Sequence, residues 1–144
     1  MVEPVHFEIR IPSCTTDGLS VQEQLIGFMD LFEYSMRDIF AMRLSLEEAI
    51  TNAIRHGNRL DPDKTVQVLC RIDSTQMEVV VTDQGEGFNP ETVPDPTLEE
   101  FIERPSGRGL MLMRAYLSVC EYGDGGRQIT MVRHRNSLLP IVQD

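Results

Sequence analysis

Hydrophobic and polar residues alternate near the N-terminus of the chain. In the segment HFEIRIPS (His6–Ser13), Phe7, Ile9 and Ile11 occupy every second position. Alternation with a period of two is typical of a strand that buries one face. We therefore predict a strand here, followed by a turn at CTTDGLS.

The next two segments have the spacing of amphipathic helices. Apolar residues recur every three or four positions from about Leu19 to Tyr34, which predicts one helix. A second helix is predicted from about Arg37 to His56, with Gly57 as its C-terminal cap. One arc of this second helix is apolar and should face the core: Met42, Leu46, Ala49, Ile50, Ala53 and Ile54.

The remaining apolar runs predict two hairpins. Thr65–Asp73 and Met77–Gly85 read as strands joined by a short connection. The segment VCEYGDGGRQITMVRHR reads as a second hairpin that turns at GDGG. We expect the tail from Asn136 to be loose.

An acidic, proline-rich segment separates the two hairpins. It carries one short helical pattern near Thr97–Glu103, and a helix resumes after Gly109 with Leu110, Met113 and Leu117 toward the core. Long segments of this kind inside a compact domain are usually lids or binding loops. We predict such a lid at about residues 86–108.

The order of the elements indicates the fold class. A strand, two helices, two strands, a lid, a helix and two strands favour an α+β two-layer sandwich. The regular βαβ alternation of a doubly wound parallel sheet is missing. At 144 residues, the chain is expected to form a single domain, residues 1–144.

The charge of the chain excludes some classes of partner. With 23 acidic and 13 basic residues, the formal net charge is −10, which argues against general nucleic-acid binding and against an anionic membrane surface. A small anionic ligand stays possible, because backbone N–H groups can form a local anion site. No apolar run approaches the ~18 residues of a membrane span. The three cysteines are widely spaced, so we expect reduced thiols and a cytoplasmic protein.

A line of polar residues follows the second helix on its other side: Ser45, Glu48, Asn52 and His56. Asparagine is unfavourable inside a helix because its side chain competes for backbone hydrogen bonds. Asn52 could offer a carbonyl oxygen to Mg²⁺, and Glu48, one turn away, could accept a proton or hold a water. Judged on this helix alone, a solvated face with an incidental asparagine is the simpler interpretation.

Two glycine motifs change that balance. In VVVTDQGEGF, Asp83 follows an apolar strand, and Gly85 and Gly87 would let the backbone approach a ligand closely. In SGRGLMLM, Gly107 and Gly109 flank a cation, Arg108, at the start of a helix, where free N–H groups suit phosphate oxygens. The first motif lacks the dense acidic residues and the final glutamate of a calcium-binding loop. The second has the spacing of neither a Walker A loop nor a dinucleotide-binding fingerprint.

Taken in order, these motifs resemble the ATP-binding domain of the GHKL superfamily. EAITNAIRHGN, DQGEGF and GRGLMLM are most similar to the anti-sigma-factor serine/threonine kinases, over roughly Val5 to Arg135. The resemblance implies a Bergerat ATP-binding fold, with a mixed, mostly antiparallel sheet and helices on one face. It also implies ATP and Mg²⁺ as ligands.

The resemblance assigns a role to each motif residue. Glu48 would be the general base and Asn52 the Mg²⁺ ligand. Asp83 would bind the adenine amino group. The other implied nucleotide contacts are Gly85, Gly87, Gly107, Arg108, Gly109, Leu110 and Thr130. His56 is either a helix-terminal histidine or a ligand contact.

The resemblance further implies protein partners. They are a small anti-sigma-factor antagonist of the STAS type, as the phosphorylated substrate, and a sigma factor. A homodimer is also implied, with the exposed face of HFEIRIPS as a candidate surface. Two alternatives stay open: a nucleotide-dependent binding module without phosphoryl transfer, and a histidine-kinase-type catalytic domain.

Overall fold

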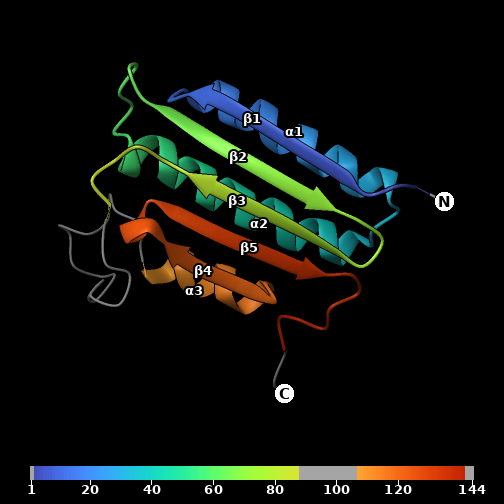
Figure 1. Cartoon of the computed structure of the whole chain (residues 1–144). Helices are drawn as coiled ribbons and strands as arrows, with labels where there is room; N and C mark the ends of the chain where they lie inside the picture. The colour runs from blue at the N-terminus through green and yellow to red at the C-terminus, as the bar shows by residue number, and fades with distance from the viewer. Residues whose placement is uncertain (1, 88–106, 142–144) are drawn as a thin grey trace.

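Five strands form one sheet in the computed structural model, which describes residues 2–87 and 107–141. The order across the sheet is β1-β2-β3-β5-β4 (Figure 1). The strands are β1 (Val5–Pro12), β2 (Thr65–Ile72), β3 (Gln76–Thr82), β4 (Val119–Gly123) and β5 (Gln128–His134). The pattern near Thr97–Glu103 and most of the predicted lid lie outside the described residues.

The described helices cover one face of this sheet (Figure 1). They are α1 (Thr15–Leu31), α2 (Met36–Asn52) and α3 (Gly107–Tyr116), with a π-helical turn at Ala53–Gly57 and a 3-10 turn at Asp124–Gly126. The α+β two-layer sandwich is therefore confirmed. All four strand pairings are antiparallel, so the described part of the sheet is less mixed than expected.

The strand alternation places its apolar residues against the helices as predicted. Ile11 is buried in the core cluster, and Phe7 and Ile9 pack against that cluster. The ring of Phe7 meets that of Phe28 on α1 edge to face, with centroids 5.4 Å apart. Both predicted hairpins are present as β2–β3 and β4–β5.

The first helix is shifted toward the N-terminus relative to its prediction. It starts at Thr15, inside the predicted turn, and stops at Leu31. The left-handed backbone of Glu33 (φ 57°) ends it. Tyr34 lies beyond the helix and is buried, and its hydroxyl donates to the Asp73 carbonyl oxygen at 2.7 Å.

The second helix buries the predicted apolar arc. Each of its six residues is at most 5% exposed, so this arc packs on the sheet. The helix ends in a wider π-helical turn, in which the Asn58 N–H donates to the Ala53 carbonyl at 2.8 Å. The prediction of Gly57 as the C-terminal cap was wrong. Gly57 is the last residue of the π-helical turn, Asn58 is its cap, and the positive φ angles nearby fall on Arg59 and Leu60.

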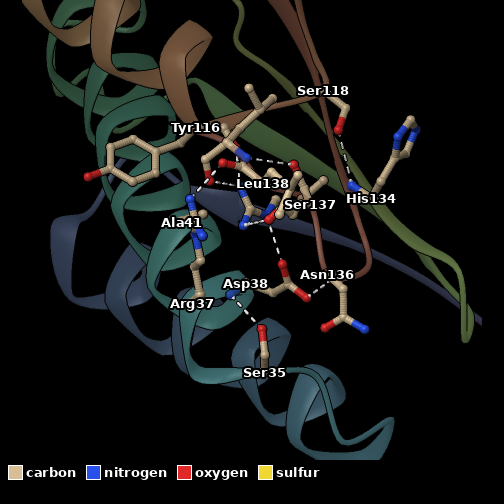
Figure 2. A network of polar contacts seen from close by, with 12 residues as sticks. Ser35, Arg37, Asp38, Ala41, Tyr116, Ser118, His134, Asn136, Ser137 and Leu138 are labelled. Carbon is tan, nitrogen blue, oxygen red and sulfur yellow. Dashed lines mark hydrogen bonds and ion pairs between the residues drawn. The ribbon is translucent and has the colours of Figure 1, made fainter. Parts of the chain in front are cut away.

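A buried ion pair ties the C-terminal segment to the start of α2 (Figure 2). Asp38 and Arg133 are both fully buried, with 2.9 Å between Oδ1 and Nε. Arg133 also donates to the carbonyls of Tyr116, Ser137 and Leu139. The backbone N–H of Asn136 donates to the other Asp38 oxygen at 2.8 Å. The expectation of a loose tail was therefore wrong for the described residues 136–141, because this pair captures them.

Within the described residues, we find no helix both long and apolar enough to cross a membrane.

Candidate functional site

A cavity of about 170 Å³ opens between the end of α2, the end of β3 and the β4–β5 turn. Its wall is mixed, with polar and apolar side chains, and the carboxylate of Asp83 comes from the end of β3. It is lined by Ala49, Asn52, Ala53, His56, Gly57, Arg59, Val81, Asp83, Glu86, Gly87, Tyr122, Gly126, Arg127 and Ile129. The structure thus brings the helix motif and the D-x-G-x-G motif together, although they are far apart in the sequence.

Asp83 is held at this site by both its backbone and its side chain. Its N–H donates to the Arg127 carbonyl at 2.9 Å, and its Oδ1 accepts from the Gly85 N–H at 2.8 Å. Burial raises the pKa of Asp83, although the Gly85 hydrogen bond and the charge of Arg127 work against this rise. A partly dehydrated carboxylate that faces a cavity is a strong acceptor for a ligand N–H group.

Two glycines make this position of Asp83 possible. A β-carbon on Gly57 would overlap the Asp83 carboxylate. A β-carbon on Gly85 would overlap the carbonyl of Gly57. Gly57 and Gly85 therefore serve first to let the loop after β3 approach the end of α2, rather than to approach a ligand.

Asn52 and Glu48 interact one helical turn apart. Asn52 is 9% exposed, and its Nδ2 donates to Glu48 Oε1 at 3.4 Å. Its carbonyl oxygen is therefore the atom it can offer to a cation. A β-carbon on Gly109 would overlap the Glu48 carboxylate, so Glu48 lies against the first turn of α3, where the helix dipole favours negative charge.

The remaining motif residues lie in the core, at the start of α3 or in the cavity wall. Leu110 is buried in the core cluster, so only its backbone is left for a phosphate contact. Gly107 is the first residue of α3, and Arg108 follows it. His56 lines the cavity.

Two residues singled out in the sequence lie outside the cavity lining. Ser45 does not face the cavity: it is fully buried and donates to the Ala41 carbonyl at 2.8 Å. Thr130 is not among the cavity-lining residues, whereas its neighbour Ile129 is. Successive side chains of a strand point to opposite faces, and Thr130 pairs with Val80 while the buried Val81 pairs with Ile129.

Several site residues had no recognised signal in the sequence. Asn58 is 1% exposed and bonds to Ser13, to the Thr65 carbonyl and to the Gln84 N–H, which joins the end of α2 to β1, β2 and the loop after β3. The HGN sequence after Asn52 was the available clue. Tyr122 and Arg127 enter the site only because β4 and β5 pair beside β3.

These residues fit ATP and Mg²⁺. The apolar part of the wall suits a base, and the Asp83 carboxylate suits its exocyclic amine. Among the described residues, no group of three or more His, Cys, Asp or Glu side chains could hold a metal ion. A cation here would share its ligands between Asn52, water and phosphate oxygens, the coordination that Mg²⁺ commonly adopts.

Comparisons with known proteins agree with this geometry. Residues 21–133 match the histidine kinase-like ATPase domain. The serine-protein kinase RsbW of Staphylococcus epidermidis is 26% identical over 138 residues, covering 90% of this chain and 86% of that protein. The anti-sigma F factor of Clostridium perfringens is 29% identical over 117 residues, covering 77% of this chain and 83% of that protein.

A solved structure supports the fold. The RsbU and RsbW domains of a Mycobacterium tuberculosis protein match with a TM-score of 0.63 and 18% identity, covering 99% of this chain and 35% of that longer one. These findings confirm the predicted fold class and family, and the names of the relatives agree with the predicted kinase class. The chain belongs to the histidine kinase-like ATPase domain family.

Proposed function

We propose that this protein is an ATP-dependent serine/threonine kinase that acts as an anti-sigma factor. It phosphorylates a small anti-sigma-factor antagonist of the STAS type and otherwise binds a sigma factor. The observation that carries this proposal is the placement of Glu48 and Asn52, one turn apart on α2, with Asn52 in the same cavity as Asp83. The names of the relatives support it as well.

In this proposal, the inner part of the cavity binds the base. Asp83 accepts a hydrogen bond from the exocyclic amine of adenine. Val81 and Ile129 supply buried apolar wall beside it. Because Thr130 lies on the strand face opposite to Ile129, we leave it out of the proposed site.

We assign the phosphates to the start of α3 and the end of α2. Gly107, Arg108 and Gly109 place backbone N–H groups at the start of α3, where the helix dipole is positive. Asn52 would supply an oxygen ligand to Mg²⁺. When bound, this ion would neutralise charge on the phosphates.

Glu48 acts as the general base of the transfer. The partner's serine oxygen forms a bond to the γ-phosphorus of ATP as the bond to the bridging oxygen breaks and ADP leaves. Glu48 accepts the hydroxyl proton, for which it needs to be within about 3 Å of that oxygen, directly or through one water. Glu48 is not itself a lining residue of the cavity, but its carboxylate accepts from Asn52, which is.

The test is phosphate transfer from labelled Mg-ATP to a STAS-type antagonist. We expect acid-stable phosphoserine or phosphothreonine on the antagonist. Glu48→Gln should reduce transfer by ~10²-fold or more and keep nucleotide binding. Glu47→Gln is the matched control, since Glu47 is exposed on the same helix. Transfer by Glu48→Gln at the wild-type rate would contradict the base assignment.

A binding module without transfer is a second candidate. Glu48 also holds Asn52 and lies against Gly109, and these contacts would stabilise the site even in a protein that transfers nothing. Nucleotide binding without any phosphorylated partner would favour this candidate. An acid-labile phosphoprotein would instead identify a histidine-kinase-type domain.

The remaining partner assignments are extensions of this proposal. A cytoplasmic protein agrees with the three free cysteines. A homodimer would use the exposed residues of the edge strand β1, among them His6, Glu8 and Arg10. The mass measured by light scattering tests the dimer: a monomer mass at micromolar concentration would remove it.

A further inference from the structure

We propose that Arg127 is a positioning residue for the nucleotide site. Its guanidinium holds the loop Asp83–Gly87 in place, so that the Asp83 carboxylate meets the base and selects one that carries an exocyclic amine. This inference rests on the proposed function in one respect, namely that the ligand is ATP.

The Arg127 side chain spans two loops that are distant in sequence. Its Nε donates to the Gly85 carbonyl at 2.8 Å, and its Nη2 donates to the Glu86 carbonyl at 3.1 Å. Its Nη1 donates to the Asp124 carbonyl at 3.0 Å. The guanidinium therefore joins the loop after β3 to the β4–β5 turn.

The backbone of Arg127 acts on the same loop. Its carbonyl accepts the Asp83 N–H at 2.9 Å. Gly87 follows with φ +80°, and a β-carbon there would overlap the Gly125 carbonyl. Arg127 thus holds Asp83 through its own main-chain carbonyl. It holds Gly85 and Glu86 through its side chain.

This arrangement has a consequence for base selection. The carbonyls of Gly85 and Glu86 already accept hydrogen bonds from Arg127. Of the two carboxylates that the loop contributes to the cavity lining, those of Asp83 and Glu86, Asp83 is the less exposed and is the acceptor that we assign to the base. In a base with an oxygen in place of the amine, that oxygen would lie opposite the Asp83 carboxylate. Both groups are hydrogen-bond acceptors, so no hydrogen bond would form and binding would be weaker. Lysine cannot replace Arg127 here, because a single ammonium lacks the planar fork that reaches several carbonyls at once.

The experiment is a double-mutant cycle with two nucleotides. Kd is measured for ATP and for inosine triphosphate, which carries an oxygen in place of the amine, in wild type, Arg127→Lys, Asp83→Asn and the double variant. We expect Arg127→Lys to weaken ATP about tenfold, the effect of one charge-assisted hydrogen bond, with little change for inosine triphosphate. The double variant should bind ATP no more weakly than Asp83→Asn alone, since both act through one group. Equal losses for both nucleotides, or additive losses, would overturn the proposal.

Arg135→Lys is the matched control. Arg135 also donates to two backbone carbonyls, those of Phe32 and Glu33, at 2.8 and 2.9 Å, but it does not line the cavity. The Arg135→Lys variant should be less stable than wild type but should keep the selectivity between the two nucleotides. A similar loss of selectivity in Arg135→Lys would show a general effect of weakened folding and would overturn the proposal.

A measurement without nucleotide separates this inference from the proposed function. Amide hydrogen exchange at Asp83 and Gly85 should become faster in Arg127→Lys and stay unchanged in Arg135→Lys. Unchanged exchange in Arg127→Lys would overturn the positioning role. If wild type binds ATP but phosphorylates no partner, the kinase proposal fails. The double-mutant cycle then still tests whether Arg127 positions Asp83. If wild type binds no ATP, the nucleotide site and the role of Arg127 in it both fail.

Discussion

The carboxylate of Asp83 lies directly over the backbone of Gly57, so close that a β-carbon at position 57 would overlap it. The two residues belong to motifs 26 positions apart in numbering, and Asn58 bridges the same two segments by accepting the Gln84 N–H at 2.7 Å. The end of α2 and the end of β3 therefore form one unit, and a change in either segment should alter the site.

Replacing Gly57 by alanine should damage the site more than the fold. The new methyl group must displace the Asp83 carboxylate, so we expect loss of most ATP affinity. Gly27→Ala is the control: Gly27 lies in α1, and a β-carbon there would have no neighbour within 4 Å, so this change should stabilise the protein by about 0.5–1 kcal/mol. Calorimetric titration and urea unfolding of both variants check the pair. Wild-type ATP affinity in Gly57→Ala would contradict the assignment.

Asp83→Asn should weaken ATP binding and so remove most of the stabilisation by nucleotide. At a ligand concentration of about a hundred times Kd, binding adds roughly 2.7 kcal/mol to the free energy of unfolding, or about 5–10 °C in Tm for a domain of this size. Thermal unfolding with and without Mg-ATP measures this shift. The asparagine can still accept the Gly85 N–H, so the unliganded fold should persist. An equal shift in wild type and Asp83→Asn would exclude Asp83 from the site.

The pH dependence of stability should report the environment of Asp83. Since burial raises its pKa in the folded state, its contribution to stability is fullest below the ordinary value of about 3.9. That contribution is lost as the pH rises through the raised pKa. We therefore expect Asp83→Asn to gain in Tm over wild type as the pH rises from 4 toward neutrality, measured without nucleotide.

Asp73→Asn supplies the opposite case. Hydrogen bonds from the Thr75 side chain and backbone, and from the Gln76 N–H, lower the pKa of Asp73. Its contribution is present above the ordinary value and lost as the pH falls through the lowered pKa. The Tm of wild type should therefore rise relative to that of Asp73→Asn as the pH rises, again measured without nucleotide. The same sign for both variants would contradict the environment assigned to Asp83.

Breaking the buried pair of Asp38 and Arg133 should cost much of the stability. Asp38→Ala leaves the Arg133 guanidinium buried without its counter-ion, for which we expect a loss of about 3–5 kcal/mol in urea unfolding. Glu23→Ala, which breaks the exposed pair with Arg43, should cost less than about 1 kcal/mol. Similar losses in the two variants would show that the buried pair contributes no more than the exposed one.

Local patterns predicted the elements well where one physical signal dominated. The alternation in β1 and the apolar arc of α2 gave the correct buried faces, because burial of apolar surface selects the period. Helix ends were less well predicted. The π-helical turn precedes Asn58, which bonds to the distant residues Ser13 and Thr65. The left-handed backbone of Glu33 goes with a local motif in which the Tyr34 N–H donates to the Met29 carbonyl at 3.0 Å, and no signal in the sequence marked it.

The site was predicted in its motifs and corrected in its details. Asn52 and Asp83 share one cavity, as the motif order implied. Ser45 lies on the same helical line as Asn52 but is buried, because such a line says which residues align and not which neighbour covers them. Thr130 lies on the strand face opposite to the cavity-lining Ile129. The role of Arg127 depends on hydrogen bonds to residues some forty positions away, which no local pattern encodes.

By itself, the sequence determined the periodicity of strands and helices, the α+β class and the three motifs, since these follow from the residue types and their spacing along the chain. The tertiary structure alone decided which residues meet. It placed Gly57 under Asp83, Arg127 across two loops and the C-terminal segment on Asp38. The physical reason is that close packing and buried hydrogen bonds are formed between segments distant in sequence, and their geometry exists only once the sheet has paired.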